Sequence, residues 1–588
     1  MQKTPPYPTT TKSAPSSPFV WRLRPAPEDA TDRLMRTTGY LPATARILAA
    51  RGLTSIASLR DFLNPNIKNL PHPDGIQDLS LAAERIIQAI LFQEPLLVFG
   101  DYDADGVTAT ALVYGFLSRL NPKTRFYLPH REREGYGLKP LHIPLFAQSG
   151  IRLVITVDCG ISSHEAIAEA RKIGMDVVVT DHHRPGDTLP QAWAVVDPQR
   201  RDCPSGLGNM AGVGLAFYLV MAIRKGLRER GYWEKFPEPP LLPETDLVAL
   251  GTVADLVPLT GINRTLVHAG LNTIRKAPRP GIQALCRVAG IRCEDVDSEA
   301  IAFRLAPRIN AAGRMAHPDM ALRLLSAPSL DTAMPLALEL DRLNSTRQVE
   351  ENRILTSIED ALEKKPDLAQ KPALVLHSQD WSLGVIGIVA SRLVRRYHKP
   401  AVLIATQDNL GQASARSIPG VDLFAALSAC SPLLEQYGGH AMAAGFRIQD
   451  RNIPAFQRQF CALAAQYPDL LGYPPPFMAD ALVDLDTLTP RLLAEMQALG
   501  PFGMGNAPPL FAARHLEVLS SLPMGSEGCH RRLLLRQPSS IHTRNISAVV
   551  FGVGKGRSFP PHIDVCLFRL RREWAKEEGV QMQIEAWY

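Results

Sequence analysis

Between residues 95 and 200 the chain alternates short apolar runs with stretches of helical pattern, and this alternation limits the possible folds more than any other feature. Runs rich in Val, Ile and Leu are expected to be strands: Leu96–Phe99, Arg125–Leu128, Leu153–Val157, Val177–Thr180 and Ala194–Val196. Helical patterns fall between them, at Val107–Leu120 and Ser162–Ile173. Because strands that are apolar on both faces are typical of parallel sheets covered by helices, the pattern predicts an α/β domain with a parallel sheet.

Acidic and imidazole side chains follow three of these strands at the point where each strand ends. They are Asp101, Asp103 and Asp105 after the first strand, Asp158 after the third, and Asp181, His182 and His183 after the fourth. A single Asp in such a turn is commonly a helix N-cap. The carboxyl ends of parallel strands, however, lie along one edge of the sheet, where ligands bind. Three such turns together predict a metal site.

The residue types narrow the choice of metal. The hexapeptide Asp101–Gly106 has the D-x-D-x-D-G pattern that opens a calcium-binding EF-hand loop, but the twelfth position is Leu112 instead of Glu and a strand precedes it. Carboxylates with few imidazoles suit Mn²⁺ or Mg²⁺, and more carboxylates than one ion needs indicate two ions. Cys159 is expected to be a small buried residue. Neighbouring side chains point apart in extended chain, so one of the paired histidines can bind metal while the other meets the substrate.

The amino-acid composition limits the classes of protein to which this chain can belong. A chain of 588 residues is expected to hold three or four domains, and 46% apolar with 21% charged residues is ordinary for a globular protein. The net charge of +6 is compatible with a polyanionic partner without requiring one. Eight cysteines without a C-x-x-C pair predict reduced thiols in the cytoplasm. The longest apolar stretch, around Gly212–Ile223, is too short to span a bilayer.

The pattern divides the chain into six expected segments. The first is a Pro-, Thr- and Ser-rich disordered tail, and the last is a barrel of five short strands with interleaved basic residues, typical of an OB-fold. The segments are a disordered tail over 1–38, helices over 39–92, an α/β domain over 93–330, a charged and solvated connector helix over 331–365, a second α/β domain over 366–477 and the barrel over 478–588. Candidate nucleic-acid contacts on the barrel are Arg532, Arg536, Arg569, Arg571 and Trp574.

Several motifs now point to a known family. Asp101–Gly106, Val157–Gly160, Asp181–His183 and Gly251–Asp255 follow the order of the DHH phosphoesterase superfamily. From about residue 40 to the C-terminus the chain resembles, more narrowly, the RecJ family of bacterial exonucleases specific for single-stranded DNA. That narrower resemblance comes from the segments 129–137, 308–314, 413–417, 438–445 and 500–506. The chain departs from the family pattern at Ala507–Phe511, where a Pro-x-Pro-x-Phe sequence is usual.

The resemblance implies roles for individual residues. Metal ligands would be Asp103, Asp105, Asp158, His182 and Asp255, with Asp158 bridging two ions. His183 would contact the scissile phosphate or the attacking water. Asp101 is a further catalytic candidate whose part in metal binding is left open. A pocket for the 5′-terminal phosphate would contain Arg131, Arg314, Ser414 and Arg416, and His440 would face the catalytic cleft from the second α/β domain.

The implied activity is metal-dependent degradation of single-stranded DNA from the 5′ end to mononucleotides, in recombination and repair. A helicase and a single-strand-binding protein would be partners, and a monomer is expected. The alternative is a DHH phosphodiesterase acting on short oligonucleotides, cyclic dinucleotides or pyrophosphate, which would have no use for the barrel. A non-catalytic nucleic-acid-binding scaffold would show broken acidic motifs, and those motifs are intact here.

Overall fold

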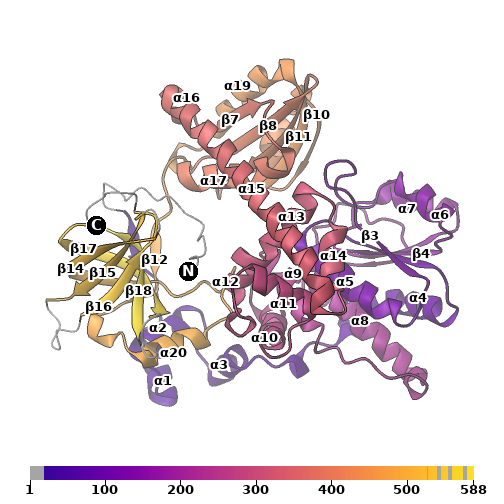
Figure 1. Cartoon of the computed structure of the whole chain (residues 1–588), viewed down its shortest axis with the longest axis horizontal. Helices are drawn as coiled ribbons and strands as arrows, with labels where there is room; N and C mark the ends of the chain where they lie inside the picture. Colours follow the sequence, from indigo (N-terminus) through magenta and orange to yellow (C-terminus); the bar gives the residue numbers. More distant parts are fainter. Residues whose placement is uncertain (1–18, 526–527, 539–544, 554–558, 574–578) are drawn as a thin grey trace. The chain divides into compact units, whose positions relative to one another are not determined.

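The computed structural model describes residues 19–525, 528–538, 545–553, 559–573 and 579–588, and it falls into two compact units (Figure 1). One unit comprises Pro71–Val257 and Leu266–Pro474, and the other comprises Met1–Leu70, Pro258–Thr265 and Pro475–Tyr588. Within the described ranges, none of the helices has the length and apolar character needed to cross a bilayer.

The Pro71–Pro474 unit begins with the predicted parallel sheet. Its strands are β2 (Leu96–Phe99), β3 (Thr124–Tyr127), β4 (Leu153–Val157), β5 (Asp176–Thr180) and β6 (Ala194–Val196). All pairings are parallel, in the order β3-β2-β4-β5-β6. The predicted parallel sheet is therefore confirmed. Because β2, β4 and β5 are neighbours, the three strand ends that carry the acidic motifs lie side by side.

Helices cover both faces of this sheet, as the apolar strands require (Figure 1). On one face, α6 (His142–Gln148) and α7 (His164–Lys172) pack against strand side chains such as Phe99, Val154 and Val179. On the other face lie α4 (Leu79–Leu91), α5 (Ala104–Ser118) and α8 (Gly212–Glu229). Burial of β4 on both faces explains why its run Leu153–Val157 contains no charged residue.

Helices continue after the sheet and lead into a long connector. They are α9 (Thr245–Ala254), α10 (Gly261–Lys276), α11 (Pro280–Val288), α12 (Ser298–Ala300), α13 (Ala306–Met315), α14 (Asp319–Leu325), α15 (Leu330–Lys364) and α16 (Pro366–Gln370). Helix α15 occupies the segment predicted for the connector. The expectation that its charges are solvated was wrong for Arg347 and Glu351, which are buried and paired at 2.9 Å. Arg392 adds a second cation to Glu351 at 2.5 Å, so this carboxylate is charge-paired inside the unit.

A second α/β region completes the unit. Its sheet has the order β10-β11-β9-β8-β7, with a parallel β7–β8 pair and antiparallel pairs elsewhere. The strands are β7 (Leu374–Ser378), β8 (Ala401–Gln407), β9 (Leu410–Arg416), β10 (Leu434–Gly439) and β11 (Ala443–Gln449). The helices are α17 (Leu383–Tyr397), α18 (Leu423–Ala429) and α19 (Ile453–Ala464).

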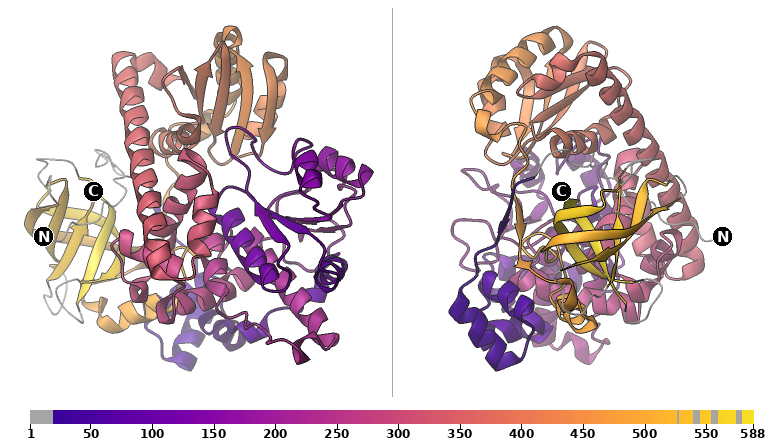
Figure 2. Two further views of the ribbon diagram at one scale, coloured as in Figure 1. Left: turned by 45° about the vertical axis from the view of Figure 1, so that its right-hand side comes forward. Right: turned by 90° about the vertical axis from the view of Figure 1, so that its left-hand side faces the viewer.

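The other unit contains the predicted barrel (Figure 2). Its strands are β13 (Ala481–Leu482), β14 (Phe511–Met524), β15 (His530–Arg536), β16 (Ile546–Val550), β17 (His562–Arg572) and β18 (Val580–Trp587). The order β13-β14-β15-β16-β18-β17 is closed by an additional β14–β17 pairing, so the barrel is confirmed. Of the candidate barrel contacts, Trp574 lies outside the described residues. Arg536 is paired with Glu517 at 2.6 Å and Arg569 with Glu585 at 3.5 Å.

The N-terminal segment corrects two expectations. Residues 1–18 lie outside the described residues, but the rest of the supposed tail is ordered as β1 (Trp21–Leu23), which pairs with β12 (Phe477–Ala479), and as α1 (Glu28–Thr38). Helices α2 (Pro42–Ala50), α3 (Ile56–Leu63) and α20 (Pro490–Ala498) belong to the same unit, whereas α4 covers the parallel sheet. The segment 39–92 is therefore not one body. Leu34 on α1 is buried in an apolar cluster that also contains side chains of α2, α20 and the barrel strands, a contact that the polar composition of the segment conceals.

Candidate functional site

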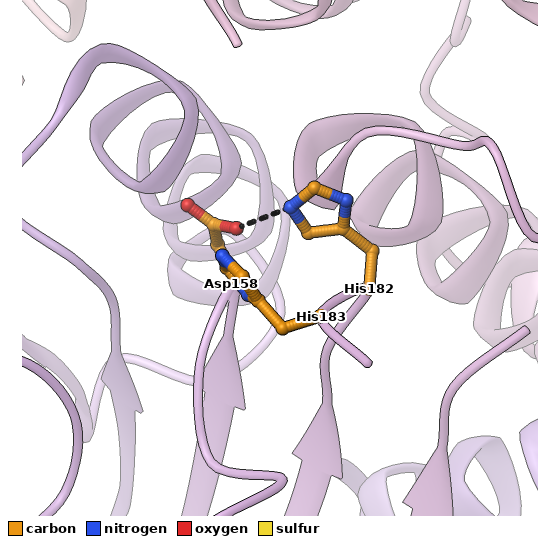
Figure 3. A group of neighbouring side chains, drawn as sticks. All are labelled: Asp158, His182 and His183. Atoms are coloured by element: carbon orange, nitrogen blue, oxygen red, sulfur yellow. Dashed lines mark ion pairs between the residues drawn. The ribbon is translucent and has the colours of Figure 1, made fainter. Parts of the chain in front are cut away.

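Four side chains from four parts of the chain converge at the carboxyl end of the parallel sheet. The Nε2 atom of His182 lies 3.1 Å from an Asp158 carboxylate oxygen, 3.8 Å from Asp105 and 3.7 Å from Asp255. Figure 3 shows the Asp158 carboxylate directed at the His182 ring. Possible ligand atoms of Asp101, Asp103 and Asp158 also lie within 4.8 Å of one another. We call this set, Asp101, Asp103, Asp105, Asp158, His182 and Asp255, the acid cluster.

Backbone N–H groups hold the second and third acids of the hexapeptide, Asp103 and Asp105, in different ways. Asp103 is the N-cap of α5, and its Oδ1 accepts hydrogen bonds from the backbone N–H groups of Asp105 and Gly106, both at 3.0 Å. Asp105 lies in the first turn of α5 and accepts from the N–H groups of Gly212 at 2.7 Å and Val213 at 3.0 Å. These two donors belong to the N-terminus of α8, where the helix dipole favours a carboxylate.

Asp158 is held in a strained and crowded position. Its φ of 60° lies in the left-handed region that non-glycine residues rarely adopt. A Cβ on Gly212 would come within 2.6 Å of the Asp158 carboxylate, and a Cβ on Gly251 would come within 2.7 Å of the Asp105 carboxylate. Strain of this kind is typical of functional sites. The two glycines therefore allow the helices α8 and α9 to approach the acids closely.

Asp181 orients the second histidine. It is fully buried, and its Oδ1 accepts from the N–H of His182 at 2.8 Å, the N–H of His183 at 3.1 Å and Nδ1 of His183 at 2.7 Å. Burial opposes ionisation of Asp181, but these hydrogen bonds and the His183 charge hold its pKa below the ordinary value. Burial lowers the pKa of His183, yet Asp181 and Asp158 outweigh burial and raise it to about 9. Asp181 thus places the Nδ1 proton of His183.

The electrostatics of the acid cluster fit a bound cation. Burial and neighbouring carboxylates raise the pKa of Asp158 well above its ordinary value and that of Asp255 to about 7. Asp101 Oδ1 is buried and has no hydrogen-bond partner among the described residues, and Asp158 Oδ1 and His182 Nε2, although 3.1 Å apart, do not form a well-aligned hydrogen bond. Unsatisfied buried acceptors of this kind are costly unless an ion binds them. Oxygen ligands with one imidazole suit Mn²⁺ or Mg²⁺.

A second cluster, of arginines, adjoins the acids. Arg131 lies over the Tyr102 ring at 5.0 Å, and Tyr102 sits between Asp101 and Asp103 in the chain. Arg314 Nη1 donates to Gly384 O at 2.9 Å, and Arg416 Nη1 donates to Ser414 Oγ at 3.1 Å. A Cβ on Gly387 would come within 3.1 Å of Arg416, so helix α17 leaves room for this guanidinium. We call Arg131, Arg314, Ser414 and Arg416 the arginine cluster.

The arginines in this cluster lack acidic partners. Within the part of the chain that the structure describes, none of Arg131, Arg314 and Arg416 is paired with a carboxylate within 4.0 Å. Burial, followed by repulsion from Arg131, Arg347 and Arg416, lowers the pKa of Arg314 to about 9. Like charges held this way favour an anion, and guanidinium groups bind phosphate in a bidentate manner.

Not every predicted residue joins these clusters. His440 is exposed beyond the end of β10, its N–H donates to Ala443 O at 2.8 Å, and its side chain makes no hydrogen bond or ion pair with another described residue. Cys159 is fully buried, as predicted. Sequence reasoning did not assign roles to Asp181, to the N-terminus of α8 or to Tyr136, whose hydroxyl reaches His183. Two of these features have a signal in the sequence: Asp181 lies in the D-H-H motif, and Tyr136 lies in a Gly-Tyr-Gly triplet.

Family models match three regions of the chain. A model described as "DHH family, N-terminal domain" matches residues 95–252, the DHHA1 domain matches 370–466 and the RecJ OB domain matches 479–586. The single-stranded-DNA-specific exonuclease RecJ of Escherichia coli is 36% identical over 496 residues, which is 82% of this chain and 85% of that protein. The chain belongs to the RecJ family.

Other RecJ proteins extend this comparison. RecJ of Bacillus subtilis is 34% identical over 89% of this chain, and the chain spans 65% of that longer relative. The crystal structure of RecJ in complex with Mn²⁺ from Thermus thermophilus matches this chain with a TM-score of 0.80 at 30% identity. The match covers 97% of this chain and 79% of the chain in that crystal structure. A Mg²⁺ complex from the same organism has a TM-score of 0.73. The RecJ fold therefore extends through both units of this chain.

Proposed function

We propose that this chain is a metal-dependent exonuclease that degrades single-stranded DNA from the 5′ end and releases mononucleotides. One observation carries the proposal: a cluster of acids suited to divalent cations adjoins a cluster of unpaired arginines suited to a phosphate. Tyr102 links the two, because Arg131 lies on its ring while Asp101 and Asp103 flank it. A 5′ phosphate bound by the arginines would direct the next phosphodiester toward the acids.

The residues that would hold two Mn²⁺ or Mg²⁺ ions are Asp103, Asp105, Asp158, His182 and Asp255, with Asp158 shared between the ions. When bound, such ions activate the attacking water and stabilise charge on phosphorus. Asp101 adds a buried carboxylate that can accept a proton or complete the ligand set. The amides of Gly212 and Val213 fix Asp105, so the ligands are oriented before the substrate arrives.

His183 would act on the substrate side of the acid cluster. Its Nδ1 proton is directed to Asp181, so its Nε2 atom is available to hydrogen-bond a phosphate oxygen or the attacking water. We therefore assign metal ligation to His182 and substrate contact to His183. His440 would contact the DNA only if the β10–β11 hairpin met the strand, since its side chain is free among the described residues.

The barrel would hold the rest of the strand. Arg532 and Arg571 are candidate phosphate contacts, and Arg571 lies 6.0 Å from the Phe551 ring centroid, an arrangement that suits base and backbone binding. We further propose that the protein works as a cytoplasmic monomer in recombination and repair, with a helicase and a single-strand-binding protein supplying and protecting the strand. Eight free cysteines are compatible with a reducing compartment.

Digestion of one single strand labelled at either end tests the activity. With Mn²⁺ present, the 5′ label should appear at once as a mononucleotide, while the 3′-labelled strand should shorten progressively. Duplex DNA of the same sequence should stay intact. Release of the 3′ label first, or cleavage limited to di- to pentanucleotides, cyclic dinucleotides or pyrophosphate, would contradict the proposal and support the small-substrate alternative.

A further inference from the structure

The hydroxyl of Tyr136 contacts both His183 and the backbone of Asp158. Its Oη atom is 3.0 Å from His183 Nδ1 and donates to the backbone carbonyl of Asp158 at 3.2 Å. The two rings also meet edge to face, with centroids 5.5 Å apart. One phenol therefore contacts both the histidine that would face the substrate and the strained backbone of the central carboxylate.

Several interactions fix the loop that carries Tyr136. Tyr136 stands between Gly135 and Gly137, whose φ values of 73° and 79° are accessible mainly to glycine. The preceding Glu134 accepts from Tyr127 Oη at 2.8 Å and from the N–H of His130 at 2.9 Å, and it lies 2.9 Å from Nε2 of the buried His142. The loop before α6 is thus fixed at its base, while Tyr136 itself remains 41% exposed.

The hydrogen bonds allow one consistent placement of protons. The Asp181 carboxylate can only accept, so the Nδ1 proton of His183 is directed to it at 2.7 Å. The Tyr136 proton goes to the Asp158 carbonyl, which is also only an acceptor. The Tyr136 oxygen then offers a lone pair to the same His183 N–H. Asp181 and Tyr136 thus hold the His183 ring from its Nδ1 side.

We propose that Tyr136 is a positioning residue for phosphodiester hydrolysis, which holds the His183 ring and the Asp158 backbone in their reactive arrangement. The inference rests on the proposed nuclease function for its kinetic consequence. Its structural part, the orientation of the His183 ring, stands apart from that function. Tyr136 acts through His183, so its effect should vanish when the imidazole is absent.

A double-mutant cycle tests this dependence under single-turnover conditions with a 5′-phosphorylated single strand. Tyr136→Phe keeps the ring and removes the hydroxyl, and it should lower the cleavage rate about tenfold to a hundredfold while KM and Mn²⁺ affinity change less than about twofold. In a His183→Ala background the same change should cost less than about twofold. The matched control is Tyr114→Phe, on a ring that packs against Phe126 away from the acids, and it should keep the wild-type rate. An unchanged rate in Tyr136→Phe, or an equal loss in both backgrounds, overturns the proposal.

A measurement that does not depend on DNA cleavage distinguishes failure of the Tyr136 proposal from failure of the proposed nuclease function. In protein labelled with ¹⁵N-histidine and loaded with Mg²⁺, the signal that disappears in His183→Ala identifies the His183 ring. Tyr136→Phe should shift this signal, because Nδ1 loses its contact with the Tyr136 hydroxyl. An identical His183 signal in the Tyr136→Phe variant overturns the positioning role even if the enzyme degrades DNA. A shifted signal in a protein that fails to degrade DNA refutes the proposed function alone.

Discussion

The acid cluster and the arginine cluster are built on opposite principles although both concentrate like charges. The acids come from the ends of the adjacent strands β2, β4 and β5 and from the end of α9, and backbone amides hold Asp103 and Asp105 from two sides. The arginines come from a loop, from α13 and from β9, and they rest on carbonyls, a hydroxyl and one ring. A tight backbone frame thus defines the acids, whereas long side chains define the arginine cluster.

The difference has a physical reason. A divalent cation requires several short oxygen ligands in a defined geometry, so carboxylates on short side chains must be fixed by the backbone. A terminal phosphate is larger and tolerates approach from several directions, which flexible guanidinium groups can supply. Substitutions in the acid cluster should therefore abolish the chemistry, while substitutions in the arginine cluster should weaken substrate capture.

The largest effect is expected for Asp158→Asn. Loss of the central charge should reduce single-turnover cleavage by on the order of a thousandfold or more and remove at least one Mn²⁺ from the protein. Electron paramagnetic resonance of free Mn²⁺ measures the bound ions directly. Asp187→Asn, at an exposed acid five residues beyond His182, is the matched control and should bind and cleave normally. Full activity in Asp158→Asn would contradict the role of Asp158 in the metal site and would favour the alternative of a non-catalytic scaffold.

Arg416→Ala should affect the other cluster selectively. We expect KM for a 5′-phosphorylated strand to rise about tenfold to a hundredfold, with little change in kcat or in Mn²⁺ binding, because a charged phosphate contact is lost. A 5′-hydroxyl strand should show a much smaller difference between variant and wild type. Arg395→Ala, at an exposed position on α17, serves as the control. Unchanged kinetics on the phosphorylated strand would remove Arg416 from the pocket.

Gly212→Ala tests the backbone frame of the acid cluster. The added methyl group would lie 2.6 Å from the Asp158 carboxylate, so α8 or Asp158 must shift. We expect Mn²⁺ affinity to fall about tenfold and unfolding stability to fall by about 1–3 kcal/mol. Isothermal titration and thermal melting measure the two effects. Gly115→Ala on α5, which has open space at its Cβ, should reduce neither. Normal Mn²⁺ affinity in Gly212→Ala would show that the acids tolerate displacement.

The smallest effect is the pH dependence of metal binding. The pKa of Asp255 is raised to about 7, mainly by burial and by Asp105, so below that pH a proton occupies this carboxyl and competes with the cation. Mn²⁺ affinity should therefore rise as pH increases through 7, by about threefold to tenfold for each pH unit below it. Titration in buffers of different ionisation enthalpy should detect proton release on binding. A pH-independent affinity would contradict the raised pKa.

Much of the acid cluster could be predicted from the sequence because its members follow secondary structure. A parallel strand delivers the residue after its last position to a known edge, so Asp101, Asp158 and His182 could be placed together from the strand pattern alone. The ends of β2, β4 and β6 also agree with the predicted runs. Asp255 was different: it lies at the end of a helix, and only the family motif pointed to it.

Local periodicity in the sequence accounts for the parallel sheet, the acidic strand ends, the long connector helix and the barrel. The folded chain was needed to show which distant residues meet: Leu34 of the supposed tail in the apolar cluster shared with the barrel, Glu351 of the connector between two arginines, and Tyr136 against His183. Periodicity describes which face of an element is buried, not what covers it. Contacts between loops and distant helices depend on chain crossings that have no periodic signature. The arginine cluster was therefore predicted only through the family resemblance, and the Tyr136 contact emerged only from the folded chain.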